Sequence, residues 1–132
     1  MRGLSFVALA SLAACTSAPP PPAMHSAKAQ ARLAEELSGL VPGQAVSCLP
    51  RYRANDMVAI DDSTLLFKDG TTRVYRNDVQ GNCSMLGGPY ALVTRSSGSS
   101  LCRGDIAQVA DVQNGITVGS CVLGDFVLYS KP

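Results

Sequence analysis

Cysteine is the residue type with the clearest chemistry in this chain of 132 residues, and the first of the five cysteines has a distinct setting. Cys15 closes the run Leu12-Ala13-Ala14-Cys15, which ends a short apolar stretch that begins after Arg2. This order is typical of a lipoprotein signal, in which the Cys15 thiol is joined to diacylglycerol. The stretch has about 11 apolar or small residues, whereas a membrane-spanning helix needs about 20. We therefore expect Cys15 to become an acylated N-terminus; the alternative is an ordinary secretory signal with a coincidental cysteine.

The other four cysteines are an even number: Cys48, Cys83, Cys102 and Cys121. Behind a secretory signal they would lie in an oxidising compartment, where disulfides persist, so we expect two bridges. Four cysteines allow three pairings, which sequence alone does not distinguish. We favour Cys83 with Cys102, which closes a local loop-rich segment, and Cys48 with Cys121, which ties an early strand to a late one. A zinc ion held by four thiolates is the competing interpretation, but no two of these cysteines have CxxC spacing.

The residue types that most often catalyse reactions are poorly placed to do so. The one histidine, His25, falls in a proline-rich stretch, where nothing would hold it beside a partner as a general base requires. The serines of residues 96–100 lack a nucleophile elbow and an identifiable base. The adjacent Asp61 and Asp62 fall in a predicted turn, where aspartates usually accept hydrogen bonds from backbone amides. We therefore predict a non-enzymatic protein with no catalytic residue, no metal site and no cofactor.

Arginine and tyrosine alternate in two short stretches, Arg51-Tyr52-Arg53 and Arg73-Val74-Tyr75-Arg76. Neighbouring guanidinium and phenol groups can stack on, and hydrogen-bond with, an anionic or carbohydrate ligand. Arg73 and Tyr75 stand two positions apart in a predicted strand and therefore share a face. We interpret Arg73, Tyr75, Arg51 and Arg53 as a possible ligand face, although a solvated strand face has the same sequence pattern.

The charge of the chain argues against a nucleic-acid partner. The sequence contains eleven Lys and Arg residues and ten Asp and Glu residues, so removal of Arg2 with the signal leaves ten of each. A chain without net charge has no overall field that attracts nucleic acid or an anionic membrane surface.

A tether and a helix are predicted to precede the rest of the domain. The four consecutive prolines of residues 19–22 predict an extended segment that can hold the domain roughly 30 Å from the bilayer. Ser26 can cap a helix that runs to Leu40, with apolar residues at helical spacing. The predicted organisation is a signal peptide over residues 1–14, a lipidated cysteine and tether over 15–26, and a globular domain over 27–132.

Beyond Gly43 the apolar residues recur with period two, which predicts about seven short strands. The candidate strands cover residues 44–49, 57–60, 64–68, 71–76, 90–95, 106–112, 116–122 and 126–129. We expect a mainly β domain behind one helix, an antiparallel barrel or sandwich, and favour a closed or nearly closed barrel because it protects the strand edges.

One hairpin is predicted in detail. The pair Asp69-Gly70 favours a two-residue type I′ loop. In that register Leu65 faces Val74, Phe67 faces Thr72, and Leu66 faces Arg73 on the other side. One face of the hairpin would then pack against the core, and the other would carry both polar and apolar side chains.

Several short motifs follow one another in a recognisable order. They are Leu37-Ser38-Gly39, Val46-Ser47-Cys48-Leu49, Tyr75-Arg76-Asn77, Cys83-Ser84-Met85-Leu86, residues 101–105 and residues 121–129. In this order the chain resembles a family of small, functionally uncharacterised envelope proteins and lipoproteins of Gram-negative bacteria. The resemblance covers about residues 33–132. It implies an envelope location and a shared fold, and it assigns no catalytic role to any residue.

These patterns predict an outer-membrane lipoprotein on the periplasmic side, because Thr16 rather than aspartate follows Cys15. The membrane would be reached through the lipid on Cys15, and the domain would bind an envelope protein or a cell-wall component, or support envelope integrity. Two alternatives stay open. The loop of residues 96–100 would inhibit a lysozyme-type hydrolase if it entered the catalytic cleft, although it lacks a basic or aromatic anchor. Otherwise the domain is a periplasmic module that binds a small ligand.

Overall fold

The computed structural model describes residues 25–84, 86 and 89–132. The predicted signal peptide, the lipidation site Cys15 and the four prolines lie outside the described residues, so these predictions remain predictions.

The N-terminal helix, α1 (Ala27–Glu36), begins at the predicted cap. The Ser26 hydroxyl accepts a hydrogen bond from the backbone N–H of Ala29 at 3.1 Å, which satisfies one of the free donors of the first turn. The helix ends at Glu36, with Leu37 as its C-cap, earlier than the predicted end at Leu40, and Gly39 then turns the chain with a φ of +73°. A glycine in this left-handed conformation is a common helix terminator.

Eleven strands and one short 3₁₀-helix, η1, follow within the described residues. Their bounds are β1 (Val41–Val46), β2 (Cys48–Pro50), η1 (Arg51–Arg53), β3 (Asp56–Ala59), β4 (Thr64–Asp69), β5 (Arg73–Asp78), β6 (Gln80–Asn82), β7 (Ala91–Arg95), β8 (Ser100–Cys102), β9 (Ile106–Asp111), β10 (Ile116–Val122) and β11 (Phe126–Ser130). The prediction of a mainly β domain behind one helix is confirmed.

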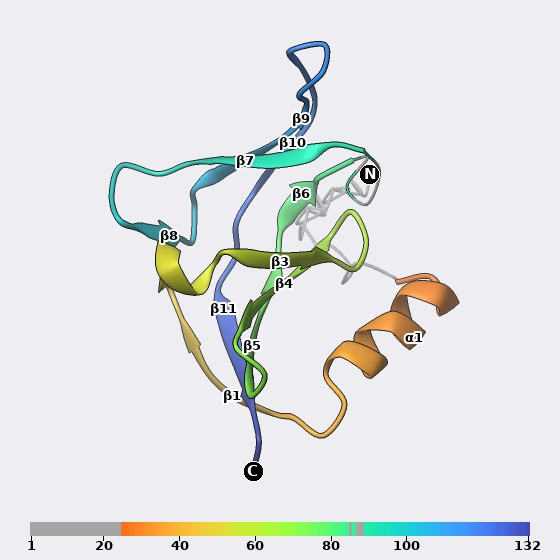
Figure 1. Cartoon of the computed structure of the whole chain (residues 1–132), viewed down its shortest axis with the longest axis vertical. Coiled ribbons are helices and arrows are strands. Elements are labelled where there is room, and N and C mark those ends of the chain that lie inside the picture. The colour runs from red at the N-terminus through yellow and green to blue at the C-terminus, as the bar shows by residue number, and fades with distance from the viewer. Residues whose placement is uncertain (1–24, 85, 87–88) are drawn as a thin grey trace, which may run out of the picture.

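The strands form three antiparallel sheets (Figure 1). A five-stranded sheet has the order β1-β11-β5-β4-β3, a four-stranded sheet has the order β6-β10-β9-β7, and β2 pairs with β8 alone. The sheets do not close into the barrel that we favoured, because β3 and β7 remain outer strands of separate sheets. The predicted strand over residues 44–49 is divided at Ser47, since β1 pairs with β11 whereas β2 pairs with β8.

The two larger sheets meet at one corner, where β5 continues into β6 and β10 continues into β11. The Asn77 side chain is fully buried there; it donates to the carbonyl of Gly124 at 2.8 Å and accepts from the N–H of Gly124 at 2.9 Å. A Cβ on Gly124 would fall against the carbonyl oxygen of Asp78, well inside contact distance. Glycine and asparagine together therefore allow the chain to bend from one sheet into the other.

The β4–β5 hairpin differs from the prediction. Its loop has three residues, 70–72, and Asp69 lies opposite Arg73. Consequently Phe67 lies opposite Tyr75 rather than Thr72, and both are buried in the main core. The predicted register was wrong because Asp69 remains in the strand, where its carboxylate lies 3.5 Å from the Arg73 guanidinium. Gly70, at the start of the loop, has a φ of +68°, a left-handed conformation that glycine adopts readily.

Both faces of this hairpin are buried, not one. Leu65 and Phe67 face the main core between the two larger sheets. Leu66 and Val74 face the opposite side, where they pack with Ile60 and with the apolar side of α1. The three-residue change of register moves Val74 from the Leu65 face to the Leu66 face, and the helix covers it there.

The structure contains two disulfides, Cys48–Cys102 and Cys83–Cys121. Two bridges were predicted correctly, but the favoured pairing was wrong. Cys48 lies directly opposite Cys102 because β2 pairs with β8. Cys83 follows β6, whose neighbour β10 carries Cys121. Strand pairing between distant segments therefore selects the partners.

Candidate functional site

The helix η1 (Arg51–Arg53) divides the predicted ligand face into two parts. Arg53 turns toward the β4–β5 hairpin, where Arg73 and Tyr75 also lie. Arg51 turns toward the connection between β7 and β8. The structure therefore brings three of the four predicted residues together and places the fourth in a different setting.

The hairpin cluster is centred on Asp69. Its Oδ2 atom lies 3.6 Å from Nε of Arg53 and 3.5 Å from Nη2 of Arg73. Arg53 also donates a hydrogen bond to the Tyr75 hydroxyl at 3.3 Å. That hydrogen bond, together with the charges of Tyr52, Tyr75 and Asp69, raises the pKa of Arg53 above its ordinary value.

This cluster does not form the exposed face that the sequence pattern predicted. Tyr75 is 4% exposed and belongs to the main core, so its ring is not offered to a ligand. Both guanidinium groups already face the Asp69 carboxylate. The cluster therefore braces the hairpin against η1.

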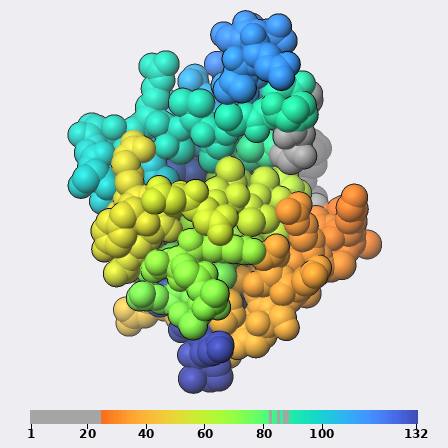
Figure 2. Space-filling view, in the orientation of Figure 1, coloured from red at the N-terminus to blue at the C-terminus, as the bar shows by residue number. Residues whose placement is uncertain are grey.

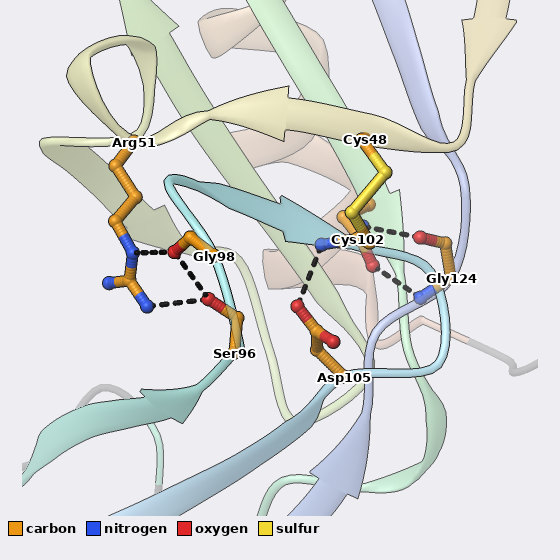
Figure 3. The surroundings of a disulfide bond; sticks show 8 residues. Cys48, Arg51, Ser96, Gly98, Cys102, Asp105 and Gly124 are labelled. Atoms are coloured by element: carbon orange, nitrogen blue, oxygen red, sulfur yellow. Dashed lines mark hydrogen bonds between the residues drawn. A yellow bond between two sulfur atoms is a disulfide. The ribbon is translucent and has the colours of Figure 1, made fainter.

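The second setting is the connection of residues 96–100, which we call the serine loop. The sequence predicted a flexible link, but Arg51 fastens it at three points. Figure 3 shows the two hydrogen bonds that the Arg51 side chain donates. The Arg51 backbone N–H donates to the carbonyl of Ser99 at 3.0 Å, and its Nη2 donates to Oγ of Ser96 at 2.6 Å. Its Nε donates to the carbonyl of Gly98 at 3.4 Å.

The other end of the serine loop is held by the Cys48–Cys102 disulfide and by Asp105 (Figure 3). Asp105 Oδ2 accepts a hydrogen bond from the backbone N–H of Cys102 at 2.8 Å. Residues 103–105 form a turn in which Gly104 has a φ of +92° and donates to the carbonyl of Leu123 at 2.9 Å. The loop thus spans two fixed points.

Two adjoining hollows lie along the serine loop. The first has a volume of about 400 Å³ and is lined by Cys48, residues 96–100, Cys102 and Asp105. The second has a volume of about 470 Å³ and is lined by Arg95, Ser96, Ser97, Gly104, Asp105 and Ile106. Binding sites for small ligands usually measure about 300–1,000 Å³. The linings combine apolar surface with serine hydroxyls and the Asp105 carboxylate, and the second hollow adds the Arg95 guanidinium. These donors and acceptors can serve a ligand rich in hydroxyl groups.

His25 is the residue that sequence reasoning placed most wrongly. Predicted to lie in the tether, it is instead ion-paired through Nδ1 with the Asp61 carboxylate. Its Nε2 lies 3.4 Å from the hydroxyl of Thr64. The chain is therefore fastened to the β3–β4 turn just before α1 begins.

A carboxylate, a histidine and a hydroxyl in one row resemble the arrangement that activates a nucleophile. Here the arrangement is structural, because Thr64 is fully buried and its hydroxyl donates to Oδ1 of Asp78 at 2.7 Å. The hydroxyl proton is therefore already donated to Asp78, and the buried oxygen is not accessible to a substrate.

Asp61 itself behaves as predicted for a turn residue. It accepts hydrogen bonds from the backbone N–H groups of Ser63 at 2.8 Å and Thr64 at 2.9 Å. Burial alone would raise the pKa of Asp61, but the hydrogen bonds from His25 and Ser63 outweigh burial and hold that pKa below its ordinary value. The carboxylate is consequently ionised over the physiological range.

Metal ligation and membrane crossing are two further properties of the described residues. No group of three or more His, Cys, Asp or Glu side chains there is arranged to hold a metal ion. No helix there combines the length and apolar character needed to cross a bilayer.

Comparisons of the chain with protein-family models, with curated proteins and with solved structures found no match. The resemblance to envelope lipoproteins therefore stays a prediction.

Proposed function

We propose that this protein is an extracytoplasmic lipoprotein, anchored in the outer membrane through Cys15, whose domain binds a cell-wall glycan without catalysing a reaction. The observation that carries the proposal is the fastened serine loop with the two serine-lined hollows beside it.

The cysteines support the compartment. All four cysteines that follow Cys15 are paired with one another in two disulfides. Disulfides of this kind persist outside the reducing cytosol. The disulfide framework thus needs no contribution from Cys15, whose thiol is available for acylation in the proposed lipobox.

The serine loop supports a saccharide as the ligand. Glycans present many hydroxyl groups, which exchange hydrogen bonds with serine hydroxyls, peptide groups and carboxylates. Because Arg51 and the Cys48–Cys102 disulfide already hold the loop, little conformational freedom is lost when a ligand binds.

The lining favours binding over hydrolysis. Glycoside hydrolases generally use two carboxyl groups on either side of the scissile bond. Among the described residues that line the two hollows, Asp105 is the only carboxylate. The same geometry weighs against lysozyme inhibition, which requires the loop to project, because Arg51 holds the loop down.

The anchor is tested by mass spectrometry of the protein isolated from membranes. We expect a mature N-terminus at Cys15 that carries fatty acid, and a Cys15→Ala variant that is not acylated. An intact leader, or a mature terminus without fatty acid, would refute the anchor.

Glycan binding is tested by co-sedimentation with purified cell-wall sacculi. We expect Arg51→Ala to reduce the bound fraction, because it removes the two side-chain hydrogen bonds that hold the serine loop at Ser96 and Gly98. Arg73→Ala is the matched control, since it removes a half-exposed arginine of the hairpin cluster and leaves the loop intact. The proposal fails if the unaltered protein does not sediment, or if the two variants lose binding equally.

A further inference from the structure

The Cys48–Cys102 disulfide lies on the outer side of its small sheet. β2 and β8 form three residue pairs, and in the middle pair Leu49 and Leu101 are 1% and 4% exposed and belong to the main core. Successive side chains of a strand point to opposite faces, so Cys48 and Cys102 point away from that core. In Figure 2 the cyan serine loop lies at the surface, beside the yellow segment of η1 that follows β2.

The first hollow of the serine loop leads to this disulfide. Both cysteines line it, together with residues 96–100 and Asp105 (Figure 3). Cys48 is exposed, whereas Cys102 is half-buried. The volume of about 400 Å³ lies within the range of sites for small ligands. A small molecule therefore has a path to the disulfide that requires no change in the fold.

The second disulfide, Cys83–Cys121, has the opposite setting. Its cysteines are 0% and 3% exposed, belong to the main core and are not among the described residues that line the two hollows. Core packing keeps these two sulfur atoms together even when the bond is open, so their effective concentration is high and the bond re-forms. Cys48 and Cys102 are held by a sheet of only three residue pairs. We therefore expect the bond between them to open more easily.

We propose that Cys48–Cys102 is a site of reversible exchange with a low-molecular-weight thiol, which enters through the first hollow. The thiolate attacks the sulfur of Cys48, the more exposed of the two cysteines, and forms a new S–S bond with it. The bond between Cys48 and Cys102 breaks, and its electron pair leaves on the Cys102 sulfur, which takes a proton from water. A second thiolate then releases the first thiol from Cys48 as a small disulfide. The protein bridge gains two electrons, and two thiols are oxidised to one disulfide.

Opening this bridge affects the serine loop and leaves the main core intact. Leu49 and Leu101 remain buried, so β2 and β8 stay attached to the core. The serine loop loses the covalent link at its Cys102 end and is then held by hydrogen bonds alone. A looser loop loses more conformational freedom on binding a glycan and therefore binds it more weakly, a consequence that rests on the proposed function.

The test uses the exported full chain with Cys15→Ala, in which the four remaining cysteines form the two disulfides. The protein is equilibrated with mixtures of reduced and oxidised glutathione, free thiols are alkylated, and the peptides are identified by mass spectrometry. We expect glutathione on Cys48 and an alkylated Cys102, while Cys83–Cys121 stays closed. The equilibrium constant for opening should be at least about tenfold larger for Cys48–Cys102, which corresponds to about 30 mV for a two-electron couple.

Ser97→Phe tests the entry path, because Ser97 lines the first hollow. This variant should slow the formation of the mixed disulfide, whereas Ser120→Phe, which changes an exposed serine outside the described lining, should not. If Ser97→Phe does not fold, as judged by circular dichroism, Ser99→Phe narrows the same hollow. The double variant Cys48→Ala/Cys102→Ala should keep the circular dichroism spectrum of the parent protein, and its amide hydrogens should exchange faster in the serine loop.

The proposal is overturned if no glutathione adduct forms on Cys48, if both bridges open at the same glutathione ratio, if the two phenylalanine variants react equally fast, or if the double variant unfolds. Opening by a protein dithiol but not by glutathione would also overturn it. Sacculus binding is measured separately. A protein that undergoes exchange but never binds sacculi refutes the proposed function alone, whereas weaker sedimentation after exchange links the two.

Discussion

Removal of the Asn77 side chain tests how the corner between the two larger sheets is held. In Asn77→Ala the backbone N–H and C=O of Gly124, both buried, lose their partner. Leaving one buried polar group unsatisfied costs about 1–3 kcal/mol, so two such groups predict a loss of about 2–6 kcal/mol in the free energy of unfolding. Since small domains are stable by about 5–15 kcal/mol, this loss is a large fraction of the total.

The assay is urea denaturation with the disulfides intact, followed by far-ultraviolet circular dichroism, because the chain contains no tryptophan. Asn114→Ala is the control; Asn114 is exposed, and its amide donates to Asp111 at 2.6 Å in the β9–β10 turn. We expect this variant to change the free energy of unfolding by about 0.5 kcal/mol or less. A loss below about 1 kcal/mol for Asn77→Ala, or equal losses for the two variants, would refute the reasoning, since one unsatisfied buried group already costs that much.

Three further predictions concern the same framework. Gly124→Ala should lower the midpoint of thermal unfolding markedly, because its Cβ would meet the carbonyl oxygen of Asp78; an unchanged midpoint would show that the corner has room. Limited reduction followed by alkylation and mass spectrometry should label Cys48–Cys102 before Cys83–Cys121, because Cys48 is exposed whereas Cys83 and Cys121 are 0% and 3% exposed; simultaneous labelling would contradict this order. The pKa of Asp61 is lowered in the folded protein, so its stabilisation is present above the unfolded pKa and is lost as the pH falls through the folded one. In Asp61→Asn the free energy of unfolding should therefore fall less steeply below about pH 4 than in the unaltered protein. The same pH dependence in both proteins would contradict this role of Asp61.

The candidate site was only partly predictable. Alternating arginine and tyrosine suggested one ligand face, but the pattern could not show that Tyr75 is buried or that the Asp69 carboxylate lies beside the Arg53 and Arg73 guanidinium groups. The serine loop looked flexible because its composition is that of a linker. Its hydrogen bonds come from Arg51, more than forty positions earlier in the chain, and no local pattern encodes that contact.

The sequence by itself determined what depends on neighbouring residues. Period-two alternation predicted the strands other than β6 and β8, Ser26 predicted the start of α1, and the even number of cysteines beyond Cys15 predicted two disulfides. These features follow from backbone hydrogen bonding and side-chain direction within a few residues, so they can be read without knowledge of the fold.

The tertiary structure decided which distant segments meet. The pairing of β2 with β8 selected Cys102 as the partner of Cys48, and the cover of α1 over Leu66 and Val74 accompanied a hairpin register different from the local expectation. His25 likewise acquired a partner only when the β3–β4 turn came beside it. The physical reason is that many pairings satisfy the same local preferences, and burial of both faces of the β4–β5 hairpin distinguishes among them only in the assembled domain.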